Sequence, residues 1–492
     1  MHKKIYDKKK VFKCLAILVT MVAAMHFTKG IGFAIIIPIA FLSLTKDRPE
    51  DVFFYVTAIV STMVANPRIA TKGVVFFMEQ RATLLLFGAL LAAKAMGGKR
   101  SPIIKPFMGM LVYLFYMAII SSAGWSPLIS YLKLFLFTFA YFAYFGAANA
   151  AAIHPRENIT SVRSVILSIA IFFLIGSVAL IPFPGLGQMD PSMFKDDPSA
   201  HFSSLFMGMT NHSQCLGPLV SALAVLLFTD LIFGVRRLSK LYILLLACCP
   251  ILIWKTSSRT ALGTFLAGMM FASYFFMKAR WVGRRWRDKV VSSMWLVAIA
   301  LSVAVACSGS MRQSAANFIQ KRLIDDQTAV DDFSMETLTS SRMWLVKSAL
   351  ANFKESPIFG NGFQVSKEMS YRRNDSRVSI LSAPIEKGVW VTAVLEEGGI
   401  IGFIIFVTFL LNVLSKMIKY KAYITASVFF VTIVSNFGEF SFFSSSYLGG
   451  FLWAMVFAGI VLDSSRARAE FYELKARMEQ EGMQQWQYTA GR

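Results

Sequence analysis

Two arginines at the ends of apolar or amphipathic runs are the first candidates for chemistry in this sequence. Arg259 lies where two apolar runs meet, and Arg342 begins an amphipathic run that ends before Pro357. A cation at the end of an apolar helix is costly unless it meets water or an anion, and a guanidinium group matches two phosphate oxygens at once. We therefore predict that Arg259 and Arg342 bind a phosphate-bearing substrate. The alternatives are that Arg259 extends to lipid head groups and that Arg342 is solvated at a membrane surface.

Carboxylates near the start of one apolar run form the second set of candidates. Glu386 comes just before this run, where it could be a general base for a sugar hydroxyl or could simply stabilise the positive end of a helix. Glu396 and Glu397 lie one to two turns into the same predicted helix. Charged side chains inside a membrane are expensive and are usually functional or paired. Glu439 is a further carboxylate at a predicted helix end.

Polar and basic residues beside these groups are candidates for substrate binding. Asn211 and His212 precede an apolar run, where they can contact sugar hydroxyls or cap the helix. Lys387 directly follows the candidate base. Arg372 and Arg373 add positive charge to the same polar stretch, for which a solvated basic turn is the simpler explanation.

The composition places these candidates in a membrane protein. The chain has 492 residues, of which 56% are hydrophobic and 16% charged, whereas soluble domains average about 45–50% apolar and about 25% charged residues. The net charge of +22 comes mostly from short gaps between apolar runs, so membrane orientation explains it better than nucleic acid does. The five cysteines show no metal-ligand spacing, and we expect no disulfide framework, metal or cofactor.

Nearly uncharged stretches of about twenty residues recur along the whole chain and predict transmembrane helices. We therefore expect an all-α polytopic membrane protein with about twelve to fourteen spans and a large, partly helical outer loop. The predicted helices lie near 12–28, 30–45, 51–65, 82–96, 107–123, 127–148, 163–182, 212–233, 241–254, 260–277, 290–307, 391–414, 422–437 and 445–462.

Basic residues alternate between the gaps that separate these runs, which predicts an orientation. Gaps rich in Lys and Arg alternate with gaps at 123–126 and 184–211 that are nearly free of them, and cytoplasmic loops carry the excess of positive charge. Both termini are therefore predicted to be cytoplasmic, and the candidate residues to lie on the outer face. The predicted parts are helices over 1–307 with an outer loop at 183–211, a large outer loop at 308–390, helices over 391–462 and a cytoplasmic amphipathic tail at 463–492.

Four motifs resemble those of the bacterial O-antigen ligase and polysaccharide polymerase superfamily. Ser258–Leu262 resembles its Ser-Arg-Gly/Thr-Ala-Leu stretch, and Arg342–Phe363 is similar to its Arg…Trp…Pro-Leu-x-Gly-x-Gly segment. Phe206–Gly217 resembles its Phe…His-x-Asn-x-Leu-Gly block, and Glu396–Gly402 its Glu-x-Gly-Ile-Ile-Gly helix start. The resemblance extends over roughly 200–460, with the motifs in the family's order.

This resemblance implies an inverting glycosyltransferase of the bacterial inner membrane that needs no metal. Its substrate would be a glycan on undecaprenyl pyrophosphate at the periplasmic face, and its partners would be membrane lipid and a chain-length regulator or other polysaccharide-assembly proteins. Many members have a His-Asn pair before the Gly-Ile-Ile-Gly motif, where this sequence has Gly388-Val389. That departure favours a polymerase, with Arg259, Arg342 and Glu386 as catalytic residues.

Two other functions remain open from the sequence. A ligase would transfer a finished glycan to lipid A or protein. A transporter or flippase would show midplane charges and helix-breaking Gly or Pro in paired halves, a pairing that the sequence does not show.

Overall fold

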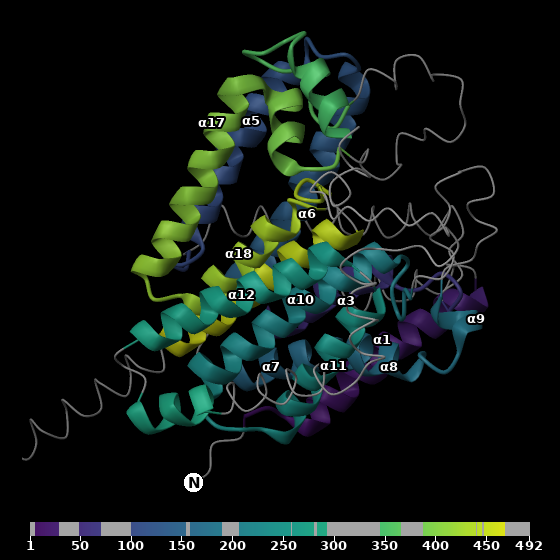
Figure 1. Ribbon diagram of the computed structural model, residues 1–492, viewed down its shortest axis with the longest axis vertical. Helices are drawn as coiled ribbons and strands as arrows, with labels where there is room; N and C mark the ends of the chain where they lie inside the picture. The colour runs from purple at the N-terminus through teal and green to yellow at the C-terminus, as the bar shows by residue number, and fades with distance from the viewer. Residues whose placement is uncertain are drawn as a thin grey trace, which may run out of the picture.

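The computed structural model shows a bundle of helices joined by loops (Figure 1). It describes residues 5–28, 49–69, 100–153, 158–188, 206–256, 258–279, 283–292, 345–365, 387–438, 440–444 and 447–467. The helices of this part are α1 (Lys8–Thr28), α3 (Pro49–Val64), η1 (Lys105–Gly109), α5 (Met110–Ser121), α6 (Pro127–Ile153), α7 (Asn158–Ala170), η2 (Ile171–Ile175), α8 (Gly176–Ala179), α9 (Pro184–Gly187), α10 (Ser213–Thr229), η5 (Asp230–Val235), α11 (Lys240–Thr256), α12 (Arg259–Lys278), α17 (Trp390–Lys419) and α18 (Tyr423–Ser435).

Long apolar helices identify an all-α polytopic membrane protein, as predicted. Among the described residues, six helices are long and apolar enough to cross a bilayer, since about twenty apolar residues span its hydrocarbon core. They are Pro127–Ile153, Ile159–Ala179, Ser213–Val235, Arg259–Lys278, Trp390–Lys419 and Tyr447–Ala467.

Most predicted helices that fall on described residues correspond to helices of the structure. The predicted segment 163–182 starts earlier, at Asn158, and contains the π-helix η2 between α7 and α8. The segment predicted at 107–123 begins as the 3₁₀-helix η1. The helices predicted at 30–45 and 82–96, nearly all of the one at 290–307, and most of the large loop lie outside the described residues.

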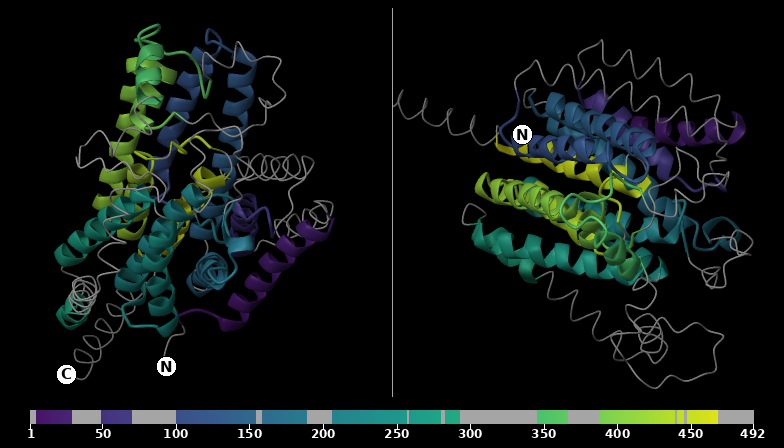
Figure 2. Two further views of the ribbon diagram at one scale, coloured as in Figure 1. Left: turned by 45° about the vertical axis from the view of Figure 1, so that its right-hand side comes forward. Right: turned by 90° about the horizontal axis from the view of Figure 1, so that it is seen from above.

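Helix α10 lies at the centre of one group of helices. It packs against α11, α12 and α18, and from Leu216 to Thr229 every one of its residues is buried. Helices α1, α3, α6 and α7 pack on one another to one side of this group, while α5 and α17 stand together at the top of Figure 1 (Figures 1 and 2). The position of α10 explains why its sequence is apolar on all faces.

A buried ion pair ties three of these helices together. The Arg163 guanidinium of α7 donates to both carboxylate oxygens of Asp230 in η5, with N–O distances of 2.9 Å. The Tyr242 hydroxyl of α11 donates to the same carboxylate over 2.6 Å. We call these three residues the Arg163 cluster. Its one cation and one anion neutralise each other, as a buried pair requires.

Candidate functional site

The most unusual backbone in the structure is a break in α17. At Gly399 the φ angle is +62°, and the helix is interrupted there. A helix break leaves carbonyl groups on one side and N–H groups on the other without partners inside the helix. Another part of the chain, residues 357–364, crosses the break and satisfies these groups. We call residues 357–364 the crossing segment.

Hydrogen bonds run from the crossing segment to both sides of the break. On the first side, the N–H groups of Asn361 and Gly362 donate to the carbonyls of Glu396 and Glu397, each over 3.0 Å. On the second side, the N–H group of Ile400 donates to the carbonyl of Pro357 over 2.9 Å. The crossing segment therefore acts as a cap for two helix ends at once.

Two glycines allow this close approach. A Cβ atom on Gly360 would lie 2.3 Å from the carbonyl oxygen of Glu397, and one on Gly399 would lie 2.3 Å from that of Ile358. Gly360 also has a φ angle of +81°. Residues with a side chain disfavour this conformation, whereas glycine adopts it readily. Both positions thus require glycine for space and for conformation.

A buried lysine and two buried carboxylates lie at the start of α17. Lys387 Nζ is 3.2 Å from Glu396 Oε2 and 3.1 Å from Glu397 Oε1, and it donates to the carbonyl of Val365 over 2.8 Å. Asn352 Nδ2 donates to Glu396 Oε1 over 3.0 Å. We call Lys387, Glu396 and Glu397 the Lys387 cluster. It joins α17 to the residues before and after the crossing segment.

Charge within this cluster keeps Lys387 ionised. Burial lowers the pKa of Lys387, but the facing carboxylates of Glu396 and Glu397 outweigh burial, so the pKa of this ammonium group lies above its usual value. The lysine is 4% exposed and the two glutamates are 2% and 0% exposed. The ammonium group of Lys387 is thus held by two carboxylates and a carbonyl, and its contact with substrate stays a prediction.

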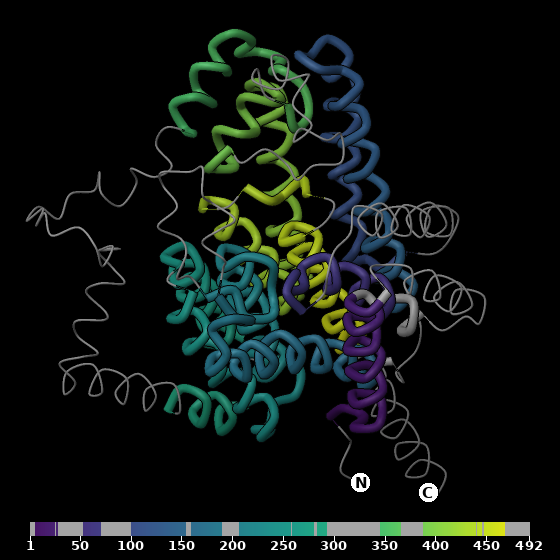
Figure 3. The backbone as a smooth tube through the Cα atoms, turned by 90° about the vertical axis from the view of Figure 1, so that its right-hand side faces the viewer, coloured from purple at the N-terminus to yellow at the C-terminus, as the bar shows by residue number. Residues whose placement is uncertain are grey.

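Further contacts hold the crossing segment on the bundle, near the top of Figure 3. The Tyr116 hydroxyl of α5 donates to the carbonyl of Phe359 over 3.1 Å, and Ser130 of α6 donates to that of Phe363 over 2.9 Å. The Phe363 ring is fully buried and lies 5.4 Å from the ring of Phe443. The crossing segment therefore contributes a buried side chain to the core of the protein, although it lies in a connection between helices.

A second group of candidates gathers where α10 and α12 begin. Arg259 is the first residue of α12, directly after the N-cap Ser258, whose hydroxyl accepts from the N–H of Ala261. A Cβ atom on Gly217 of α10 would lie 3.1 Å from Ser258 Cβ. The two helices therefore meet closely within their first turns, and their positive ends face the same region.

His212 is the N-cap of α10. Its Nδ1 atom accepts a hydrogen bond from the N–H of Gln214 over 3.0 Å, so in the neutral ring the proton is on Nε2. Burial lowers the pKa of His212, which keeps the ring neutral at pH 7. The sequence left open whether His212 caps the helix or binds a sugar hydroxyl. The structure shows that it caps α10. Its Nε2–H group can donate a hydrogen bond to a hydroxyl oxygen.

A chain of contacts links the start of α12 to the start of α17. Gly438 packs so tightly on Thr260 that a Cβ atom would lie 2.1 Å from Thr260 Cγ2. Two residues before it, the carbonyl of Asn436 accepts from the N–H of Trp390, the first residue of α17, over 3.1 Å. The Arg259 region and the Lys387 cluster are thus neighbours through the turn after α18.

Comparison with known protein families shows which family this region resembles. Residues 242–407 match the family described as O-antigen ligase. Over these residues the chain is similar to the O-antigen ligase family. The match runs from α11 through α12 and the crossing segment into α17, so it contains both Arg259 and the Lys387 cluster. A search of curated proteins gave no match.

Several predicted site residues in and around the matched region lie outside the described residues, so their positions stay predictions. The structure brings Asn211 and His212 next to the helix that begins with Arg259, and it buries Lys387. The predicted residues outside the described part are Arg342, Arg372, Arg373, Glu386 and Glu439.

Sequence reasoning missed the partners that complete these groups. Asn352 and Asn361 bind the Glu396 side chain and carbonyl, and Tyr116 binds the carbonyl before the break. The sequence indicated that the run from Arg342 ends before Pro357, but it did not show which helix residues 357–364 would contact. Among the described residues, no group of three or more His, Cys, Asp or Glu side chains is arranged to hold a metal.

Proposed function

We propose that this protein is a polysaccharide polymerase of the bacterial inner membrane. It would join glycan units carried on undecaprenyl pyrophosphate, at the periplasmic face, for exopolysaccharide or O-antigen. The observation that carries the proposal is the position of Arg259 at the joined N-terminal ends of α10 and α12, inside the region that is similar to the O-antigen ligase family. This orientation, with both termini cytoplasmic, is part of the proposal.

The electrostatics of this position favour a bound diphosphate. The N-terminal end of a helix carries a partial positive charge, so a cation there is disfavoured by about 0.3–1 kcal/mol. Two such ends lie together at Arg259. An anion between the helix ends and the guanidinium reverses the sign of both interactions. A diphosphate leaving group is such an anion.

In the proposed reaction, an acceptor sugar hydroxyl attacks the anomeric carbon of the lipid-linked glycan. A carbon–oxygen bond forms to the acceptor oxygen while the bond from the anomeric carbon to the phosphate oxygen breaks, with inversion. The diphosphate leaves with the electron pair, held by Arg259 and Arg342. The hydroxyl proton passes to Glu386 as general base.

The Lys387 cluster supports the proposed base by fixing its neighbour. Lys387 is held by two carboxylates and a carbonyl, and Glu386 directly precedes it. A base must stay within hydrogen-bond reach of the proton that it removes. The buried anchor at Lys387 restricts how far residue 386 can move. We assign Asn211 and His212 to the sugar hydroxyls, and Arg372, Arg373 and Glu439 to the rim of the same site.

A ligase is the second candidate, because the matching family is described as O-antigen ligase. Position 388 supports the polymerase instead. It lies where the related ligases have a His-Asn pair, but here it is a glycine with a φ angle of +74°, a conformation that glycine adopts at no steric cost. The missing histidine is therefore consistent with the local backbone.

The test is polymer formation in cells that lack the native gene and carry variants. Arg259→Ala and Glu386→Ala should each abolish polymer, whereas Lys278→Ala, a basic residue at the opposite end of α12, should leave it unchanged. Single unpolymerised units should accumulate if the protein is a polymerase. Unattached long chains would identify a ligase, and normal polymer in both variants would exclude the proposed mechanism.

A further inference from the structure

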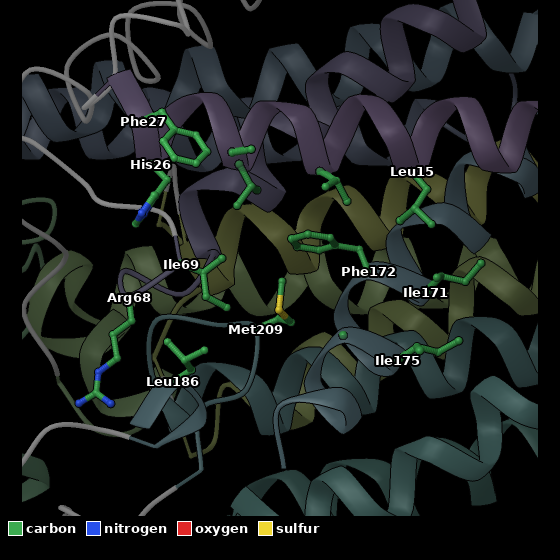
Figure 4. Close-up of a pocket in the computed structure, with 14 residues that line it drawn as sticks. Leu15, His26, Phe27, Arg68, Ile69, Ile171, Phe172, Ile175, Leu186 and Met209 are labelled. Atoms are coloured by element: carbon green, nitrogen blue, oxygen red, sulfur yellow. The ribbon is translucent and has the colours of Figure 1, made fainter. Parts of the chain in front are cut away.

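An apolar groove of about 620 Å³ runs along α1, on a flank of the protein whose lining includes no residue of α12 or α17. Its walls come from α1, from η2 and the start of α8, and from Ile69, Leu186 and Met209 (Figure 4). The side chains that face it are almost all aliphatic or aromatic, Leu15, Val22 and Phe172 among them. Such a lining suits hydrocarbon.

The groove has the length of one membrane leaflet. Along α1 it extends from Leu15 to Phe27, which at 1.5 Å per residue is about 18 Å. The hydrocarbon core of a bilayer is about 30 Å thick, so the groove matches about half of it. It suits a lipid chain that enters from one side of the membrane.

Two basic side chains mark one end of this groove. His26 and Arg68 both lie at the end of the groove opposite Leu15, with a gap between them (Figure 4). The Arg68 guanidinium is oriented by a hydrogen bond to the carbonyl of Gly185. Arginine is suited to phosphate oxygens, so an apolar channel with this end fits a long-chain lipid with a phosphate head group.

The segment that carries His212 separates this groove from Arg259. The N–H of Asn66 donates to the carbonyl of Met209, which lines the groove, and the N–H of Asn211 donates to the carbonyl of Val64, both bonds between 2.8 and 2.9 Å. On its other side, α10 packs on α12. His212 therefore lies between two basic positions, one on the groove and one at the start of α12.

We propose that the groove holds the polyprenyl diphosphate anchor of the acceptor glycan, as a second lipid site distinct from the donor's. This inference rests on the proposed polymerase function, in which both reacting glycans are linked to a lipid diphosphate. With its prenyl chain along α1 and its diphosphate at Arg68, the acceptor presents its sugar towards His212. The donor diphosphate approaches the same residue from Arg259.

The test counts bound lipids on the purified full-length protein by native mass spectrometry, with undecaprenyl diphosphate as the probe. Wild-type protein should retain two probe molecules. Arg68→Gln removes the phosphate ligand and Ala23→Trp fills the groove from α1, so each variant should retain one and bind the lost molecule at least tenfold more weakly. Arg259→Gln should remove the other molecule, and Arg68→Gln with Arg259→Gln should remove both.

Controls separate this inference from the proposed function. Phe12→Trp places the same side chain on α1 outside the groove lining and should retain two probes. If Arg68→Gln and Ala23→Trp bind like wild type while Arg259→Gln loses a probe, the groove site is wrong and the donor site stands. If only Arg68→Gln and Ala23→Trp lose a probe molecule while Arg259→Gln binds like wild type, the groove site stands and the donor site at Arg259 is wrong. Equal retention of phosphatidylglycerol in the groove would make it a phospholipid site and overturn the acceptor assignment.

Discussion

The Arg163 cluster and the Lys387 cluster are both buried and ionic, but they are built differently. Arg163 and Asp230 balance one positive against one negative charge, with a bidentate geometry and a tyrosine on the remaining lone pair. Lys387 faces two glutamates, so this cluster carries one more carboxylate than cation. The first joins three helices of the bundle, whereas the second joins a broken helix to a segment from a distant part of the chain.

This difference indicates different roles. A balanced bidentate pair can be replaced by apolar residues at little cost, because its desolvation offsets its attraction. An unbalanced cluster next to a helix break is harder to explain by stability alone. Its value lies in holding residues 352–365 against α17, beside the position proposed for the catalytic base.

The largest effect is expected from Lys387→Met. Two buried carboxylates would lose their cation, which costs about 3–5 kcal/mol for a buried pair, and the crossing segment would lose its anchor. The purified variant should melt at lower temperature, and trypsin should cut faster after the exposed Lys354. Arg163→Met is the matched control: a similar loss of melting temperature with no change at Lys354. Faster cleavage at Lys354 in both variants would mean that the two clusters do not differ in role.

A smaller effect is expected from Gly360→Ala. The added Cβ would collide with the carbonyl oxygen of Glu397, and the positive φ angle adds strain of about 1–3 kcal/mol. Thermal melting and cleavage at Lys354 report the result. Gly263→Ala on α12 meets nothing within 4 Å and should be neutral or slightly stabilising. Equal melting temperatures for the two variants would show that the crossing segment does not need its close approach.

His212→Ala should lower the free energy of unfolding by about 0.5–2 kcal/mol, the usual range for an N-cap residue replaced by alanine. His212→Asn keeps a cap and should melt close to wild type. Because burial lowers the pKa of His212, the unfolded chain binds the proton more readily. Wild-type stability should therefore fall as pH drops below the ordinary histidine pKa of about 6.5. That pH dependence should be weaker in His212→Asn; an unchanged dependence would assign it to other groups.

The smallest effect is expected when the whole Arg163 cluster is replaced. Arg163→Met, Asp230→Leu and Tyr242→Phe together remove the charges and the hydroxyl that depends on them, so stability should stay within about 1 kcal/mol of wild type. Polymer formation in cells should also persist. Loss of polymer with an unchanged melting temperature would give this cluster a functional role and remove the contrast with the Lys387 cluster.

Much of the fold was predictable because apolar runs of membrane length have one dominant explanation. The helices around α10 follow from their length and uniform apolarity. Interruptions such as η2 and η5 were not predictable, since π-helical turns depend on packing against neighbours and leave the apolar pattern unchanged. The Arg163 pair was missed for a related reason: the sequence shows two charges far apart, and only the crossing of α7 with η5 brings them together.

For the candidate site, the position of a residue relative to the ends of the apolar runs predicted its place in the structure better than its residue type did. Arg259 and His212 were predicted near helix starts, and the structure places them in the first turn of α12 and at the cap of α10. The sequence also indicated that Glu396 and Glu397 would be functional or paired. It did not show that Lys387 pairs with them, because a partner nine or ten residues away depends on how the chain enters α17. Positive φ angles at Gly360 and Gly399 likewise depend on a contact between distant segments.

The repair of α17 by the crossing segment has a mechanical consequence. Hydrogen bonds on both sides of Gly399 connect residues 357–362 to the spans of the bundle, and such bonds tolerate little stretching. A displacement of this segment would therefore also move the two halves of α17 that it joins. The ring of Phe406, further along α17, packs on Tyr113 of α5, so α5 would feel the same displacement.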